Sequence, residues 1–153
     1  MKNIKAFFIL SLLALPFITS AQSSEAEVLR KIFSAEKRAI TESFLQLNGT
    51  DANTFWALYD EYENERKALA DMRIKLIQDY ADQYEGLTND EASGLVARSF
   101  KGRDAWLKLQ KKYFKKMSKE VDAKTATSFL QLEQYIHTAV NFDLYDAIPF
   151  VGE

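Results

Sequence analysis

The chain has 153 residues, with 20 basic and 22 acidic side chains, a single histidine and no cysteine. The absence of cysteine excludes disulfides, thiol nucleophiles and thiolate metal ligands, so the fold depends on packing alone. The slightly acidic balance argues against nucleic acid as a partner, and the length permits one domain with its own core.

Residues 1–21 have the three-part pattern of a secretory signal peptide. Two lysines precede an apolar run from Phe7 to Leu15, Pro16 breaks the run, and small residues follow. A membrane helix is the less favoured interpretation, because the run is short for a bilayer. Cleavage would leave residues 22–153 as a single helical domain, with 18 basic against 22 acidic residues and a net charge of −4. We expect a periplasmic or extracellular protein, with no transmembrane segment after cleavage.

Glycine and proline are scarce after the leader, while Ala, Leu, Glu and Lys are abundant, which is typical of a few long helices. No alternating run of strand length is present. At about 1.5 Å per residue the second helix would be roughly 50 Å long. We therefore predict an all-α fold, an elongated four-helix hairpin or bundle with one long central helix pair and with Trp56 and Trp106 as core anchors. The predicted helices are 24–46, 51–84, 89–119 and 123–147.

Residues that cap or stop helices mark the predicted breaks. A glycine follows one helix, and a Ser, Thr or Asp side chain accepts hydrogen bonds from the first backbone amides of the next. A Thr followed three residues later by Glu forms a capping box. The expected caps and stops are Gly49 with Thr50 and Asp51, Gly86, the Thr88–Glu91 capping box, Asp122 and Pro149.

Every predicted helix carries polar residues on its apolar face when it is stepped at 100° per residue. We favour an internal polar network, because a buried charge without a partner costs several kcal/mol. The alternative is that the faces are partly open and form a binding surface, and both interpretations can hold on different stretches. The candidates for the internal network are Glu36, Arg66, Arg73, Glu133 and His137.

Seven lysines and one acid, Asp104, lie between residues 101 and 119. Such a run is usually a solvated face, partly neutralised here by the acidic helix 51–84. Alternatively, it attracts acidic, partly unfolded proteins or anionic lipids. Apolar side chains lie beside the lysines at helical spacing. The candidate protein-binding surface is Phe100, Arg103, Leu107, Lys111, Phe114 and Lys115.

No catalytic constellation is recognisable. His137 is the only candidate imidazole base, and the chain has no glycine-rich phosphate loop. Glu133 and His137 are four residues apart and would supply two metal ligands, but two ligands without a second motif are a weak signal. We interpret His137 as a core histidine and expect a protein that is not an enzyme and that uses no cofactor or metal.

The export signal, the absence of cysteine, the long helices and the capping-box turns resemble the Spy/CpxP-like family of periplasmic stress proteins. That family carries Leu-Thr-x-x-Gln motifs at helix starts, and residues 87–91 match with Glu91 in place of Gln. Residues 47–59 and 121–129 are looser copies. The resemblance implies a cradle-shaped helical homodimer that binds unfolded proteins without ATP, or that senses envelope stress.

The sequence therefore predicts an ATP-independent, chaperone-like envelope protein that binds unfolded or partner proteins. The alternative is a regulatory adaptor that binds one specific envelope sensor or anti-sigma factor.

Overall fold

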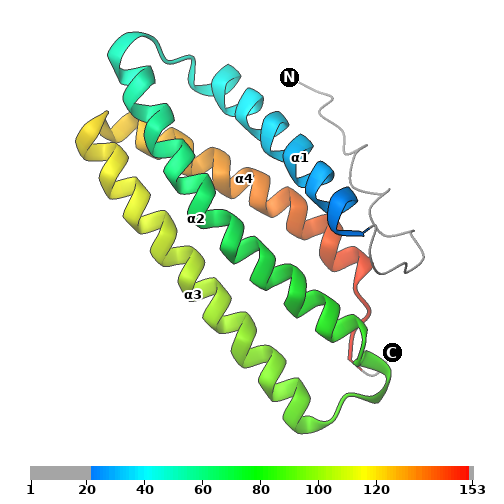
Figure 1. Ribbon diagram of the computed structural model, residues 1–153. Helices are drawn as coiled ribbons and strands as arrows, with labels where there is room; N and C mark the ends of the chain where they lie inside the picture. Colours follow the sequence, from blue (N-terminus) through cyan, green and yellow to red (C-terminus); the bar gives the residue numbers. More distant parts are fainter. Residues whose placement is uncertain (1–21, 152–153) are drawn as a thin grey trace. The chain divides into compact units, whose positions relative to one another are not determined.

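The computed structural model describes residues 22–151, except the side chains of 22–32, 143, 146 and 147. The predicted signal peptide, residues 1–21, lies outside the described residues. Within this range the chain forms α-helices and one short 3-10 helix and no strand, which confirms the all-α prediction (Figure 1). The helices are α1 (Gln22–Leu45), α2 (Gly49–Ala81), η1 (Tyr84–Gly86), α3 (Asn89–Glu120) and α4 (Ala123–Ala147).

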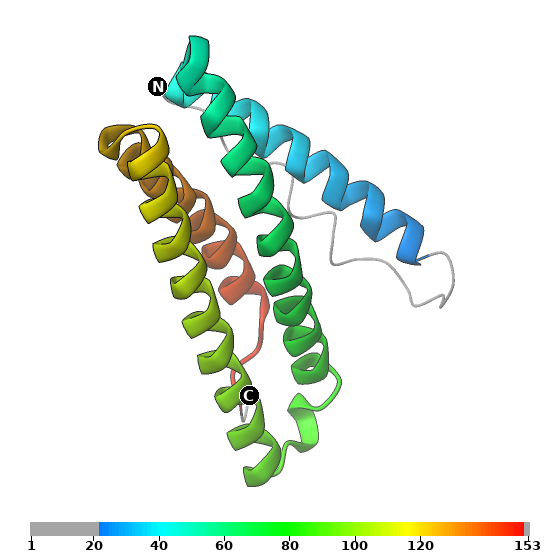
Figure 2. The same ribbon diagram turned by 60° about the vertical axis from the view of Figure 1, so that its left-hand side comes forward.

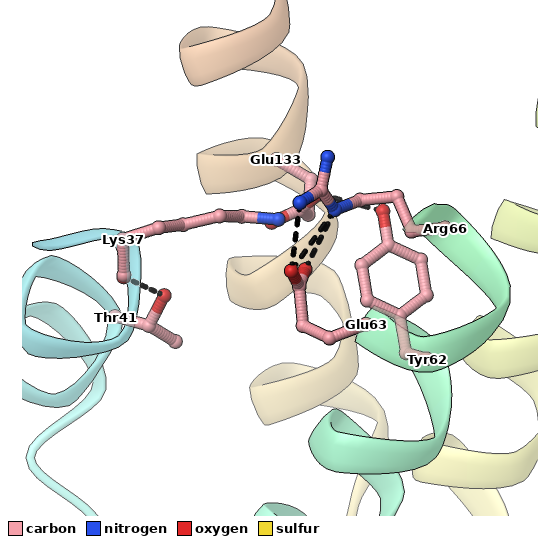
Figure 3. Close-up of polar contacts among 6 residues, drawn as sticks. All are labelled: Lys37, Thr41, Tyr62, Glu63, Arg66 and Glu133. Carbon is pink, nitrogen blue, oxygen red and sulfur yellow. Dashed lines mark hydrogen bonds and ion pairs between the residues drawn. The ribbon is translucent and has the colours of Figure 1, made fainter. Parts of the chain in front are cut away.

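The chain divides into two compact units, residues 1–44 and 45–153. The described part of the first unit is α1, in which the hydroxyl of Thr41 donates a hydrogen bond of 2.8 Å to the carbonyl oxygen of Lys37 (Figure 3). The second unit contains α2, α3 and α4 and every candidate site residue except Glu36. The single domain over residues 22–153 stays a prediction.

In the second unit, α2, α3 and α4 run side by side in alternating directions (Figures 1 and 2). The connection between α3 and α4 is only residues 121–122, so these helices must run antiparallel. The backbone of α3 approaches both α2 and α4. Large side chains bridge α2 and α4, and this arrangement places one face of each helix in a common core.

Aromatic rings from α2, α3 and α4 form the centre of this core. Phe55 and Tyr62 of α2 meet Phe129 of α4 edge to face, with ring centroids 5.5 and 5.3 Å apart. Tyr62 also meets Tyr113 of α3 at 5.4 Å. Edge-to-face pairs of this kind add stability beyond the area that they bury. Met117 of α3 is fully buried beside them.

The predicted tryptophan anchors are not at the centre of the core. Trp56 is only partly buried and packs against it, because one residue along a helix turns the side chain about 100° away from the direction of Phe55. Trp106 of α3 is also partly buried and stacks on His137 of α4, with centroids 5.0 Å apart. Phe55 and Tyr62 take the central role instead.

Two of the predicted caps are confirmed. The hydroxyl of Thr88 accepts from the backbone amide of Glu91, and the carboxylate of Glu91 accepts from the amide of Thr88 at 2.9 Å. The carboxylate of Asp122 accepts from the amides of Lys124 and Thr125 at 2.8 and 2.9 Å. Helix α4 ends at Ala147, just before the extended residue that precedes Pro149, as the proline requires.

The other two boundaries differ from the prediction. Helix α2 begins at Gly49, with Asn48 at the N-cap, so Thr50 and Asp51 lie in its first turn rather than capping it. Gln46 takes a positive φ, 49°, beyond the end of α1, and Gly49 takes a second one, 64°. Helix α2 ends at Ala81, and Gly86 lies in η1 after the helix rather than at its end.

Candidate functional site

Helix α3 carries an exposed row of apolar side chains. Phe100 is 58% exposed, Leu107 47% and Phe114 37%, and Val96, four residues before Phe100, is 51% exposed. Steps of three, four or seven residues place these side chains on one face of the helix. Arg103, Lys111 and Lys115 are exposed around them. We call Val96 and the six predicted surface residues the α3 stripe.

The α3 stripe borders α4 and carries its own cation–aromatic contact. The guanidinium of Arg103 lies over the ring of Phe100, 5.7 Å from its centroid. Phe114 lines the same small cavity as Leu130 of α4. The stripe thus combines apolar area with cationic groups, a composition found where proteins bind other proteins.

The side of α3 that faces α2 carries ion pairs. Lys112 pairs with Glu65 and Lys116 with Glu61, both at 2.6 Å, as the predicted neutralisation by the acidic helix requires. Hydrogen bonds donated by Lys112 and by the hydroxyl of Tyr113 hold the pKa of the Glu65 carboxyl below its ordinary value.

The remaining lysines of the 101–119 run are exposed and pair with no described carboxylate. A positive charge therefore remains on the α3 stripe, at Lys111 and Lys115, and beside it, at Lys101, Lys108 and Lys119.

A buried polar network joins α2 and α4 (Figure 3). The hydroxyl of Tyr62 donates a 2.6 Å hydrogen bond to Oε2 of Glu133, and the two residues are 1% and 2% exposed. The guanidinium of Arg66 donates three hydrogen bonds of 2.9–3.0 Å to the carboxylate of Glu63. Burial and then the nearby Glu133 carboxylate raise the pKa of the Tyr62 hydroxyl. Burial alone would lower the pKa of Arg66, but the contact with Glu63 raises it.

The predicted network residues therefore divide among several places. Arg66 and Glu133 lie in the buried network, although their direct partners, Glu63 and Tyr62, were not among the candidates. Glu36 is exposed and belongs to the other unit. The spacing of Glu63 and Arg66, three residues apart on one helix, was the signal in the sequence.

Arg73 and His137 lie away from the buried network, toward the C-terminal end of α2. The Nη2 group of Arg73 donates to Oδ1 of Asn141 on α4. His137 is one turn before Asn141 and stacks on Trp106, with ring planes 19° apart. Burial, and then the charge of Arg73, lower the pKa of the His137 imidazole. These side chains thus form a second polar group, distinct from the first.

No protein-family model, curated protein or solved structure matches the chain. Among the described residues, no three His, Asp or Glu side chains gather in the way that a metal ion would need. None of the described helices is long and apolar enough to cross a membrane. The function must therefore be argued from the surface of the chain itself.

Proposed function

We propose that this is an exported, non-catalytic helical protein of the periplasm that binds unfolded or partner proteins through the α3 stripe, without ATP. The signal-peptide pattern of residues 1–21 supports the address. One observation carries the binding activity: Val96, Phe100, Leu107 and Phe114 are exposed on one helix face. The resemblance of the sequence to the Spy/CpxP-like family supports a chaperone-like or envelope-stress protein.

The chemistry of the α3 stripe favours acidic, partly unfolded partners. Unfolded proteins expose apolar side chains, which the exposed Phe and Leu side chains of the stripe can cover. The lysines beside the stripe attract negatively charged chains over a longer range and accelerate encounter. Such attraction is screened over about 8–10 Å at physiological salt, so binding should weaken as salt rises.

An aggregation assay with two test proteins of opposite charge examines this proposal. We expect an equimolar amount of the mature protein to suppress the aggregation of reduced α-lactalbumin, which is acidic. Reduced lysozyme, which is basic, should be protected less, and added salt should reduce the difference. Failure to suppress the aggregation of either test protein at low salt would contradict the proposal.

A matched pair of double variants locates the activity on the molecule. Phe100→Gln with Leu107→Gln removes two apolar side chains of the α3 stripe. Tyr135→Gln with Phe142→Gln removes two aromatics on α4 that are also seven residues apart and are 70% and 72% exposed. Exposed substitutions change stability by about 0.5 kcal/mol or less, so both variants should fold. Only the α3 variant should lose protection.

The regulatory adaptor is the alternative that the same surface allows. A pull-down from an envelope extract with the wild-type protein and the α3 double variant separates the two functions. Many substoichiometric partners support the chaperone-like function. One stoichiometric partner, such as a sensor domain or an anti-sigma factor, that is lost with the α3 variant supports the adaptor.

A further inference from the structure

Three helices bring cationic groups together near the C-terminal end of α2. Arg73 reaches from α2 to the side-chain amide of Asn141 on α4. One turn earlier on α4, His137 stacks on Trp106 of α3. Arg103 lies one turn before Trp106, on the same side of α3. Arg73, Trp106, His137 and Asn141 are each partly exposed, so the group is open to solvent. We call Arg73, Arg103, His137 and Asn141 the cationic cluster.

The described side chains supply no carboxylate to this cluster. Neither Arg73 nor Arg103 forms an ion pair with a described residue. Burial lowers the pKa of Arg73, and the positive charge of Arg103 lowers it further, whereas Tyr145 of α4 raises it. Half-buried like charges are unfavourable unless an anion lies between them.

Arg66, seven residues before Arg73 on α2, has the carboxylate partner that the cationic cluster lacks. Glu63, three residues before Arg66, accepts all three of its hydrogen bonds. The residue three before Arg73 is Ala70, whose methyl group cannot accept a hydrogen bond. The chain thus supplies an internal anion to one half-buried arginine of this helix and leaves the other with an amide and the positive charge of Arg103.

We propose that the cationic cluster is a binding site for an oxyanion, a carboxylate or a phosphate. The guanidinium of Arg73 has the fork of donors that matches two oxygens of such a group, and Arg103 adds a second charge. The Nδ2 group of Asn141 donates no hydrogen bond to a described residue and is available as a further donor. The oxyanion comes either from an acidic side chain of a bound protein or from free inorganic phosphate.

His137 is the only histidine of the chain and therefore reports on the site without ambiguity. Its imidazole signal in proton NMR, followed from about pH 8 to about pH 5, gives its pKa in the full mature protein. The titration is repeated with inorganic phosphate, with an acetylated and amidated tetraglutamate peptide, and with sodium chloride at the same ionic strength. The charged group that acts on His137 is Arg73, and Arg103 acts on Arg73 in turn. Glu133 lies one turn before His137 on α4.

We expect an anion in the site to raise the pKa of His137 by about 0.5 or more relative to the chloride control, because it offsets the charge of Arg73. A rise with phosphate shows a site for a free anion. A rise with the peptide alone assigns the site to acidic side chains of a bound protein. No rise with either probe overturns the proposal.

Two variants and one control make this test specific. Arg73→Gln should abolish the effect of the anion and raise the pKa of His137 in the anion-free protein. Ala70→Glu should place a carboxylate beside Arg73, as Glu63 lies beside Arg66, and should raise the pKa without added anion. Lys67→Gln, the same loss of charge at an exposed position of α2 outside the cluster and the α3 stripe, should respond to anions like the wild type.

Circular dichroism confirms that each variant is folded. If the pKa of His137 responds to anions in both Arg73→Gln and Ala70→Glu as it does in the wild type, the proposal is overturned. The site does not depend on chaperone-like activity. Anion binding with no protection in the aggregation assay refutes the proposed function alone, and the reverse result refutes the anion site alone.

Discussion

Replacing Tyr62 by phenylalanine tests the buried bridge between α2 and α4. The change removes one oxygen and keeps the ring, so the edge-to-face contacts with Tyr113 and Phe129 remain. What is lost is the 2.6 Å hydrogen bond to the carboxylate of Glu133, which is 2% exposed. A hydrogen bond to a charged group contributes about 1.5–3 kcal/mol, and water reaches this carboxylate poorly. We expect a loss of about 2 kcal/mol in the free energy of unfolding.

Urea unfolding followed by circular dichroism measures this loss, and a second tyrosine provides the matched control. The hydroxyl of Tyr113 also donates to a carboxylate, that of Glu65, at 2.8 Å, but Glu65 is exposed. In Tyr113→Phe, water can replace the hydroxyl, so the cost should stay below about 1 kcal/mol. Equal losses in the two variants would refute the reasoning, because the burial of the acceptor would then have no influence.

Three further predictions concern the helix ends, the pH dependence and the surface pairs. Asp122→Ala removes the side-chain cap of α4 and should cost about 0.5–2 kcal/mol in urea unfolding, whereas an unchanged midpoint would show that the cap is dispensable. Because the pKa of His137 lies below its ordinary 6.5, the unfolded chain binds the proton first as pH falls. In anion-free buffer, stability should therefore decline as the pH falls below the ordinary imidazole pKa of about 6.5, and His137→Gln should flatten that decline. Lys112→Gln and Lys116→Gln should each cost less than about 1 kcal/mol, with a smaller loss at high salt in thermal melts; a larger, salt-independent loss would contradict a screened surface pair.

Local chemistry in the sequence located most of the helices. The Thr88–Glu91 capping box and Asp122 act on backbone amides two or three residues away, so the sequence alone defines them. The start of α2 and its end at Ala81 were misplaced because the expectation relied on glycine. Gly49 does take a positive φ, 64°, but as the first residue of α2; Gln46 takes another after α1, and Gly86 takes none. Nothing in the local sequence distinguishes such a glutamine from its neighbours.

The shared face of the apolar side chains on α3 could be predicted from their spacing, but neither the exposure of that face nor the polar partners on α2 and α4 could. The spacing of Phe100, Leu107 and Phe114 placed them on one face, and all three are exposed. The predicted partners were charged pairs on different helices. That prediction therefore missed Tyr62 as the donor to Glu133, and Glu63, on the same helix, as the partner of Arg66. The Tyr62–Glu133 contact depends on how α2 packs against α4, whereas the pairing of Glu63 with Arg66 could be read from their three-residue spacing.

Site-specific photo-crosslinking tests most directly whether the α3 stripe binds non-native proteins. A photoreactive phenylalanine analogue replaces Leu107 in one protein and the similarly exposed Tyr135 of α4 in another, and each is irradiated with reduced α-lactalbumin. The account predicts a crosslinked product from position 107, diminished by salt, and little from position 135. Equal crosslinking from both positions, or none from position 107, would contradict it.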